Sequence, residues 1–464
     1  MGGGLLQLVA YGAQDVYLTG NPQITFFKVV YRRHTNFALE AIEQTFNGNP
    51  GFGSRVTCQI SRNGDLIHKA YLVVSLPSTN AVYCNYIGLR LINYIEVEIG
   101  GQRIDRHYSN WMYIWNELTL PISKRAGFND MVGAYGGAVN GNATIAVGGS
   151  SITANVLNPV LYIPLEFWFC RNIGLALPLI ALQYHEVKFN LLFETAAICC
   201  APGKVGTLTS FNASIWVDYI YLDTDERRRF AQLSHEYLIE QLQFTGQEAI
   251  ISSSIKPKLN FNHPVKEIIF FVSNTASQDN NNWFNFTTRI NSIQQTHEFR
   301  TPDDLNNALK TSPITSTATT SIYNYSKNPI ATAKLVLNGN DRFAVRNGSY
   351  FNLIQPFQHH DNIPSNSGIN VYSFGLKPEE HQPSGTLNMS RIDTAVLNLT
   401  LTTIPSSLTL PTALTTVSTS TSTLPLITSA TSVYSTTNAN LYVYATNYNV
   451  LRILSGMGGL AYSN

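Results

Sequence analysis

Hydrophobic and polar residues alternate along most of the chain in short runs, and this pattern predicts β-strands. In 55–60 and 94–99 the alternation has a period of two, which is typical of strands with one buried face. Turn residues bound the runs, and β-branched and aromatic residues fill them. The predicted strands are 38–46, 55–60, 69–76, 94–99, 160–169, 186–193 and 214–222, then 237–244, 255–261, 267–272, 333–338, 371–376, 395–401 and 441–453.

Two segments, 106–118 and 301–310, are predicted to be helices within loops. The second has a good start signal, because Thr301 can cap it and Pro302 suits its first turn. The aspartates that follow favour the positive end of a helix.

The second set of strands repeats the first in the same order. AIEQTFNG (41–48) resembles LIEQLQFTG (238–246), and VEIGGQRI (97–104) resembles LVLNGNDRF (335–343). HKAYLVVSL and HEVKFNLLF have counterparts in VKEIIFFVS and TAVLNLTL. Four matches in order, offset by about 200 residues, indicate a duplicated domain.

The junction of the two copies falls in 223–236, the densest cluster of charge in the chain. Each copy offers about eight short antiparallel strands, the number found in a jelly roll. The predicted fold is therefore all-β, with two consecutive eight-stranded jelly rolls and short helices in loops. The expected segments are an N-terminal arm (1–25), a first jelly roll (26–222), a linker (223–236), a second jelly roll (237–455) and a C-terminal tail (456–464).

Turn dipeptides predict where the connections are short. Asn-Gly at 63–64 and 338–339, and Gly-Gly at 100–101, permit the positive φ angles of tight turns. Long connections are expected at 106–159, 273–332 and 403–440. Successive connections alternate between the two ends of such a roll, so all three long insertions should lie at one end.

Composition favours a protein that buries its outer surface against neighbours. Charged residues make up 13% of the chain, the net charge is +1, and Tyr and Phe are abundant. Interface cores favour aromatic residues and exclude charge. The five cysteines are scattered and form no CxxC pair, which indicates folding in a reducing compartment and not a disulfide framework.

No pattern of catalytic, cofactor-binding or metal-binding residues stands out, so we do not expect an enzyme. His359-His360-Asp361 lacks a further ligand nearby, and adjacent histidines on a strand point to opposite sides. Glu96 and Glu98 share a strand face, which we interpret as solvent-facing. Balanced charge without a recognition motif argues against specific nucleic-acid binding.

Two kinds of surface site are predicted. Apolar residues of the arm precede the first strand and should dock onto a neighbour, and a basic cluster follows them. The residues predicted to make these inter-subunit contacts are Leu5, Leu8, Val9, Arg32 and Arg33. Asn-x-Ser/Thr sequons in the predicted loops make Asn142, Asn285 and Asn324 possible glycosylation sites.

Several long strings resemble a known family. LVAYGAQDVYLTGNPQITFFKVVYRRHTNF (8–37), VEIGGQRIDRHY (97–108), WVDYIYLDTDERRRFAQ (216–232) and NYNVLRILSGMGGLAYSN (447–464) are similar to the double jelly-roll major capsid proteins of nucleocytoplasmic large double-stranded DNA viruses of algae and protists. The resemblance covers nearly the whole chain. It departs at 126–157, 273–330 and 403–440, where such proteins differ from one another.

The resemblance implies a structural protein of the virion. Three chains would bring six similar barrels into a pseudo-hexagonal homotrimeric capsomer, and capsomers would tile an icosahedral shell assembled in the host cytoplasm. The end with insertions would face outward. The plain end would face minor capsid proteins and an internal viral membrane. The alternative is a carbohydrate-active or glycan-binding protein, since paired jelly rolls occur there too, and the mass of the particle in solution separates the two.

Overall fold

The computed structural model describes residues 3–77, 83–134, 143–147, 150–154, 160–200, 210–275, 283–287, 328–402, 418–419, 422–423 and 439–462. The chain divides into two units, Met1–Phe37 and Ala38–Asn464. The first unit contains two short helices, α1 (Gly3–Val9) and α2 (Val16–Thr19), and neither buries any residue.

The second unit begins with a sandwich of two antiparallel sheets, which we call the first sandwich. One sheet has the order β1 (Phe37–Gln44), β11 (Asn212–Leu222), β3 (Leu66–Ser75), β8 (Val160–Pro164), and β9 (Leu177–Pro178) also pairs with β3. The other has the order β2 (Arg55–Gln59), β10 (Val187–Phe193), β4 (Ile92–Ile99), β5 (Gln102–Tyr108).

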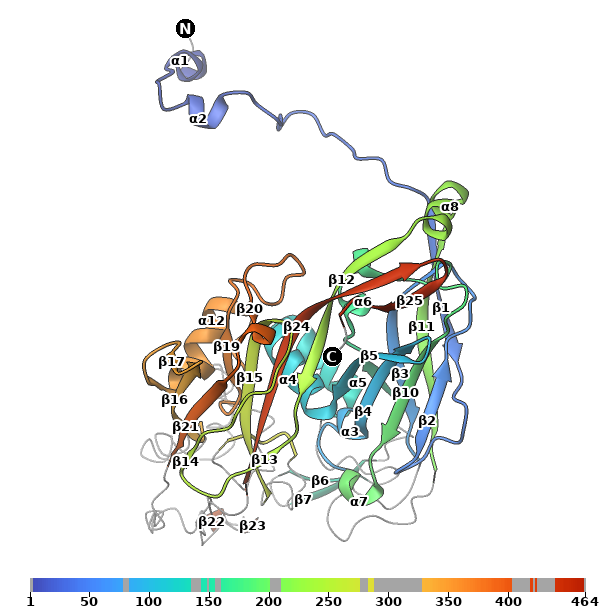
Figure 1. The fold of residues 1–464 in the computed structure, drawn as a ribbon, viewed down its shortest axis with the longest axis vertical. Helices are drawn as coiled ribbons and strands as arrows, with labels where there is room; N and C mark the ends of the chain where they lie inside the picture. Colours follow the sequence, from blue (N-terminus) through green and yellow to red (C-terminus); the bar gives the residue numbers. More distant parts are fainter. Residues whose placement is uncertain are drawn as a thin grey trace. The chain divides into compact units, whose positions relative to one another are not determined.

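The second sandwich repeats this arrangement (Figure 1). Its first sheet has the order β12 (His235–Phe244), β24 (Ala439–Leu454), β15 (Pro264–Asn274), β19 (Asn370–Ser373), with β13 (Glu248–Ala249), β20 (Leu387–Asn388) and β25 (Met457–Leu460) attached. Its other sheet has the order β14 (Ser254–Ile255), β21 (Ala395–Leu401), β16 (Ile330–Leu337), β17 (Asn340–Asp341), with β18 (Arg346–Asn347). The predicted all-β fold of two consecutive jelly rolls is confirmed.

The helices are short and lie between strands. They are α3 (Ile87–Arg90), α4 (Ser109–Thr119), α5 (Ile122–Val132), α6 (Trp168–Arg171), η1 (Ile173–Leu175), α7 (Ala196–Cys199), α8 (Thr224–Gln232), η2 (Tyr350–Ile354), α12 (Gln355–His359) and η3 (Met389–Arg391). Two small hairpins pair β6 (Ala143–Val147) with β7 (Ser150–Ala154), and β22 (Ser418–Thr419) with β23 (Ser422–Thr423).

Two of the three predicted tight turns are present. Gly100 and Gly101 have φ of 58° and 85°, and Asn338 and Gly339 have φ of 46° and 82°. Two successive positive φ angles match a two-residue hairpin whose twist suits the flanking strands. The connection at 60–65 is short, as predicted, but it is not a two-residue hairpin, because β2 and β3 belong to opposite sheets and Gly64 has no positive φ.

The predicted helix at 106–118 starts later than expected. Its first three residues extend β5, where Arg106 pairs with Glu96 and Tyr108 pairs with Tyr94. The ladder with β4 overrides the local helical pattern until Ser109, where α4 begins. The other predicted helix, at 301–310, lies outside the described residues.

Strand ends next to the predicted insertions lie at corresponding ends of the two sandwiches. In the first sandwich Val160, which follows the insertion 106–159, pairs with Ser75 at the end of β3, and Asn212 at the start of β11 pairs with the same residue. In the second sandwich Asn274 pairs with Ala439, and Ile330 pairs with Leu401. The long connections therefore leave from one end of each sandwich.

The sheet that contains β15 is buried on both faces. Ile268 and Phe270 belong to the core of the second sandwich, whereas Ile269 and Phe271 join the core of the first. Successive strand residues point to opposite faces, so β15 contributes to two cores at once. We call the contact of the first sandwich with this sheet the seam.

Candidate assembly surfaces

Helix α4 lies at the centre of the seam (Figure 1). It is buried almost all round, with Trp111 fully enclosed. The Trp111 ring lies 5.9 Å from the ring of Tyr444 on β24, and Tyr113 stacks at 4.7 Å on Phe284. A helix that buries nearly all of its residues has to be covered on every side, and the second sandwich supplies part of that cover.

Polar bonds hold the end of α4 to the second sandwich. Glu117 accepts a hydrogen bond from the Ser365 backbone N–H at 2.8 Å and is paired with Arg125 at 2.5 Å. The Asn362 side-chain amide donates to the carbonyl of Leu120 at 2.6 Å. These bonds satisfy a buried carboxylate and a helix-end carbonyl that would otherwise be costly to bury.

A buried chain of charges crosses the seam. Glu240 of β12 accepts from Arg171 of α6 at 2.7 Å and from Lys266 of β15 at 2.8 Å, through the same oxygen. The Arg171 guanidinium also lies 4.0 Å from the ring centre of Trp115 on α4. Lys266 donates to the Pro378 carbonyl at 2.5 Å and is 1% exposed. Removing one partner of such a group leaves an unpaired buried charge.

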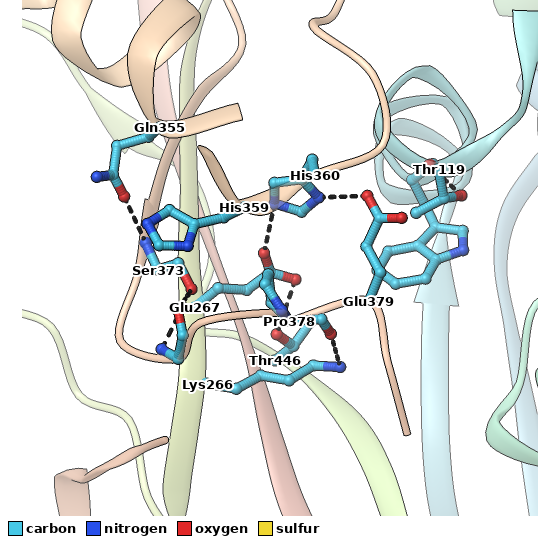
Figure 2. Close-up of polar contacts among 12 residues, drawn as sticks. Thr119, Lys266, Glu267, Gln355, His359, His360, Ser373, Pro378, Glu379 and Thr446 are labelled. Atoms are coloured by element: carbon cyan, nitrogen blue, oxygen red, sulfur yellow. Dashed lines mark hydrogen bonds and ion pairs between the residues drawn. The ribbon is translucent and has the colours of Figure 1, made fainter. Parts of the chain in front are cut away.

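Beside the buried charges of Arg171, Glu240 and Lys266, His360 lies between two carboxylates (Figure 2). Its Nε2 is 3.0 Å from Glu267, and its Nδ1 is 2.6 Å from Glu379. Burial alone would lower the pKa of His360, but the two carboxylates raise it to about 9. Burial pushes the pKa of Glu267 upward, and the charge of His360 outweighs this and leaves that pKa lowered. The imidazole is therefore held as a cation at neutral pH.

The C-terminal hairpin docks on the first sandwich. β25 pairs with β24, while the carbonyl of Gly456 accepts from the Tyr184 N–H at 3.0 Å. A Cβ at Gly458 would lie 2.7 Å from the Leu182 side chain, so the close approach requires glycine there. Residues 457–460 are thus a strand that ties the second sandwich to the first.

One flank of the second unit carries an uncovered sheet. On the sheet of β3, β8 and β11, apolar side chains point away from the core of the first sandwich. We call Tyr71, Val73, Tyr162 and Trp216 the aromatic face. Tyr162 is 47% exposed and Trp216 39%, and Tyr71 and Val73 are half-buried. A sheet face turned to solvent normally carries polar residues, so this one is suited to burial.

A helical projection on the second sandwich is also uncovered. Leu353 and Ile354 of η2 and Phe357 of α12 point outward, and we call these three residues the apolar knob. Phe357 is 75% exposed, and the other two are nearly half exposed. Figure 1 draws α12 and the strands β1 and β11 on opposite flanks of the second unit, with α4 between them.

The residues predicted for inter-subunit contacts lie in the first unit and are exposed. Leu5, Leu8 and Val9 belong to α1, while Arg32 and Arg33 lie in a segment without regular structure. Their role in contacts stays a prediction.

The predicted glycosylation sites also stay predictions. Asn142 and Asn324 lie outside the described residues. Asn285 is buried, and its side-chain oxygen accepts hydrogen bonds from the Thr287 N–H and hydroxyl at 3.1 and 2.8 Å. This environment does not favour attachment of a glycan to Asn285 in the folded chain.

Glu96 is not solvent-facing as we expected. It is 5% exposed and paired with Arg106 at 2.6 Å, and Asn190 donates to Glu98 at 2.7 Å. The ladder with β5 and β10 brings these polar partners over the carboxylates. Within the described residues, no group of three His, Cys, Asp or Glu side chains is arranged to hold a metal ion.

Comparison with known proteins decides the family. Residues 226–459 match the family model described as "Large eukaryotic DNA virus major capsid protein". Residues 25–223 match the family model described as "Major capsid protein N-terminus". The chain belongs to the major capsid protein family of large eukaryotic DNA viruses. It is 48% identical to the major capsid protein of Pyramimonas orientalis virus and 47% identical to that of Phaeocystis pouchetii virus, with all of each chain covered.

Solved structures agree with this assignment. A chain of the PBCV-1 virus capsid has a TM-score of 0.73 and 39% identity, with 95% of this chain and 100% of that chain covered. The Faustovirus major capsid protein has the same fold, with a TM-score of 0.66 at 14% identity, over 96% of this chain and 94% of that one. The family forms the icosahedral shell of large DNA viruses, so this protein is a structural component of a virion capsid and not an enzyme.

Proposed function

We propose that three copies of the chain close into a pseudo-hexagonal capsomer, the tile of the shell. One observation supports this most directly: each chain carries two sandwiches of the same strand order side by side, joined by a buried seam. Three such chains together contain six sandwiches of similar structure, which can be arranged around a pseudo-sixfold axis. A ring of three needs heterologous contacts, in which one flank of a chain meets the opposite flank of the next.

The mass of the purified protein in solution tests the proposal. Light scattering coupled to size exclusion should give a stable particle of three times 51.4 kDa. The proposal is contradicted if the protein is monomeric at every concentration at which it stays in solution. A ring with an even number of chains would contradict it too.

We propose that the N-terminal arm links neighbouring copies within the shell. Leu5, Leu8 and Val9 put apolar side chains on a helix that buries none of its residues, and Arg32 and Arg33 add positive charge farther along. Exposed apolar residues of this density are normally covered by a partner. Deleting residues 1–25 should leave folded trimers that assemble poorly into shells. Loss of folding in that variant would contradict a linking role.

We propose that the end of each sandwich that bears the long connections faces outward, and that the opposite end faces minor capsid proteins and an internal membrane. None of the described helices has the length and apolar character to cross a membrane. Assembly in the host cytoplasm is supported by the five cysteines, all of which are buried free thiols. Protease accessibility of intact virions tests the orientation, since cleavage should be confined to the parts of the long connections that lie between α5 and β8, between β15 and β16, and between β21 and β24.

A further inference from the structure

The two sandwiches correspond strand by strand, so their connecting helices also correspond. β3, β8 and β11 occupy the places in the first sandwich that β15, β19 and β24 occupy in the second. Helix α4 follows the hairpin of β4 and β5, and η2 with α12 follow the hairpin of β16 and β17. The apolar knob is therefore the counterpart of part of α4.

The register extends the correspondence to single residues. Trp216 pairs with Tyr71 across β11 and β3, as Tyr444 pairs with Ile269 across β24 and β15. Both strand pairs also contain a β-bulge near the same end, between Val217 and Tyr219 and at Lys266. The aromatic face is thus the counterpart of the sheet surface buried in the seam.

Within one chain these two kinds of surface already bind each other. Trp111 of α4 packs on Tyr444, and Ile269 and Phe271 join the same core. The apolar knob and the aromatic face, which are the corresponding pair of surfaces in the rest of the chain, are uncovered. The elements that carry them, α12 and β11, lie on opposite flanks of the second unit (Figure 1). One chain cannot bring them together, but the next copy can.

We infer that the apolar knob of one copy docks on the aromatic face of the next, and so repeats between chains the contact that α4 makes within a chain. This inference rests on the proposed trimer and adds the surfaces that close it. Six contacts of one type would then surround the ring, three within chains and three between them. Large aromatic residues at the centre of an interface carry most of its binding free energy.

Two single variants and their mixture test the inference. Phe357→Glu places a charge on the knob and leaves the face intact, whereas Trp216→Glu does the reverse. Each variant alone should be a folded monomer, with its dissociation constant raised by about 100-fold or more. Mixed in equal amounts, they should form a one-to-one dimer and no trimer, because one intact knob and one intact face remain and the chain of contacts cannot extend.

A matched control is Leu233→Glu, which adds a charge at another exposed leucine just after α8. This variant should remain trimeric. If both test variants stay trimeric, the inference is wrong and the trimer closes elsewhere; if the unchanged chain is a monomer, the proposed function itself fails. Circular dichroism and thermal unfolding establish that each variant is folded.

A second measurement covers the case in which a glutamate variant does not fold. A chain carrying Phe357→Cys and Trp216→Cys should be linked into covalent trimers by a short flexible bis-maleimide, since the native thiols are buried. Either single cysteine alone should give no more linked species than the unchanged chain. Absence of linked trimers from a trimeric double variant would overturn the inference.

Discussion

Raising the pH from 6.5 to 9 should lower the stability of the folded chain by removing the proton of His360, which lies in the second sandwich beside the seam. The side chain is fully buried, and carboxylates lie 3.0 and 2.6 Å from its two ring nitrogens. The pKa of His360 is raised from 6.5 to about 9 in the folded chain. A raised histidine pKa means that its contribution to stability is fully present below pH 6.5 and is lost as the pH rises through 9.

The expected loss is about 3 kcal/mol, since each unit of pKa difference corresponds to about 1.36 kcal/mol. No discount for solvent screening applies, because none of the His360 side chain is exposed. Burial lowers the pKa of His68, so its contribution changes below pH 6.5. The thiols of the unfolded chain ionise near pH 9, whereas burial keeps them protonated in the folded chain, so they add a further loss toward the upper end of this range. The contribution of His360 is therefore the difference in pH dependence between the unchanged chain and a variant that lacks this histidine.

The measurement is the free energy of unfolding by urea at several pH values between 6.5 and 9, at one fixed protein concentration because self-association shifts apparent stability. In His360→Gln the loss of stability over this range should be smaller by about 3 kcal/mol, and stability at pH 6.5 should fall by about 3–5 kcal/mol because Glu267 loses the cation that lies 3.0 Å away. His360→Gln combined with Glu267→Gln should recover much of that loss.

The neighbouring His359 provides the matched control. Its ring lies at the surface and contacts the Leu376 carbonyl at 2.9 Å. His359→Gln should keep the full dependence on pH. The reasoning is refuted if the unchanged chain loses less than about 1 kcal/mol between these pH values, or if His360→Gln loses as much as the unchanged chain.

Three further predictions concern the seam and the core. Trp111→Ala should lower the free energy of unfolding by about 3–5 kcal/mol in urea titrations, because the ring is fully enclosed and its cavity cannot close. Gly458→Ala should free the C-terminal hairpin and speed its removal by carboxypeptidase, since a Cβ there meets Leu182 at 2.7 Å; Gly459→Ala, which meets only the flexible Gln102 side chain, should not. All five thiols should fail to react with a thiol reagent at pH 8 until urea unfolds the chain, because burial raises the pKa of thiols such as Cys84 to about 12.

The duplicated fold could be predicted from the sequence because its signals are local. Alternation with a period of two marks the strands, and the dipeptides at 100–101 and 338–339 dictate positive φ within a few residues. The dipeptide at 63–64 misled because the same residues also suit a connection that crosses between sheets. Only the pairing of distant strands distinguishes a hairpin from a connection between sheets, and the residues near the turn do not determine that pairing.

The seam could not be predicted in the same way, although the sequence contains a trace of it. The run 268–272 is apolar without alternation, which is typical of a strand covered on both faces. Lys266 and Glu267 at its start are the signal of a buried ionic pair. The partner of Glu267 is far away in the chain, so the sequence singled out His360 only through its neighbours His359 and Asp361, in a pattern that resembles a metal site, whereas the structure pairs its imidazole with Glu267 and Glu379.

The contact within a chain and the proposed contact between chains face different physical demands, and their residues differ accordingly. The seam is buried within each folded chain, so it can contain Phe271, Ile269 and the buried cation Lys266, whose partner Glu240 belongs to the same chain. The aromatic face has to tolerate exposure to water before assembly and burial against the next copy afterwards. At the position that corresponds to Ile269 it carries Tyr71, whose hydroxyl tolerates water while its ring can still be buried.

On this argument, Tyr71→Ile should tighten the trimer and make the free chain aggregate. Light scattering of dilute and concentrated samples would measure both effects. Unchanged solubility together with weaker trimers would show that Tyr71 serves the interface through its hydroxyl and not through its ring.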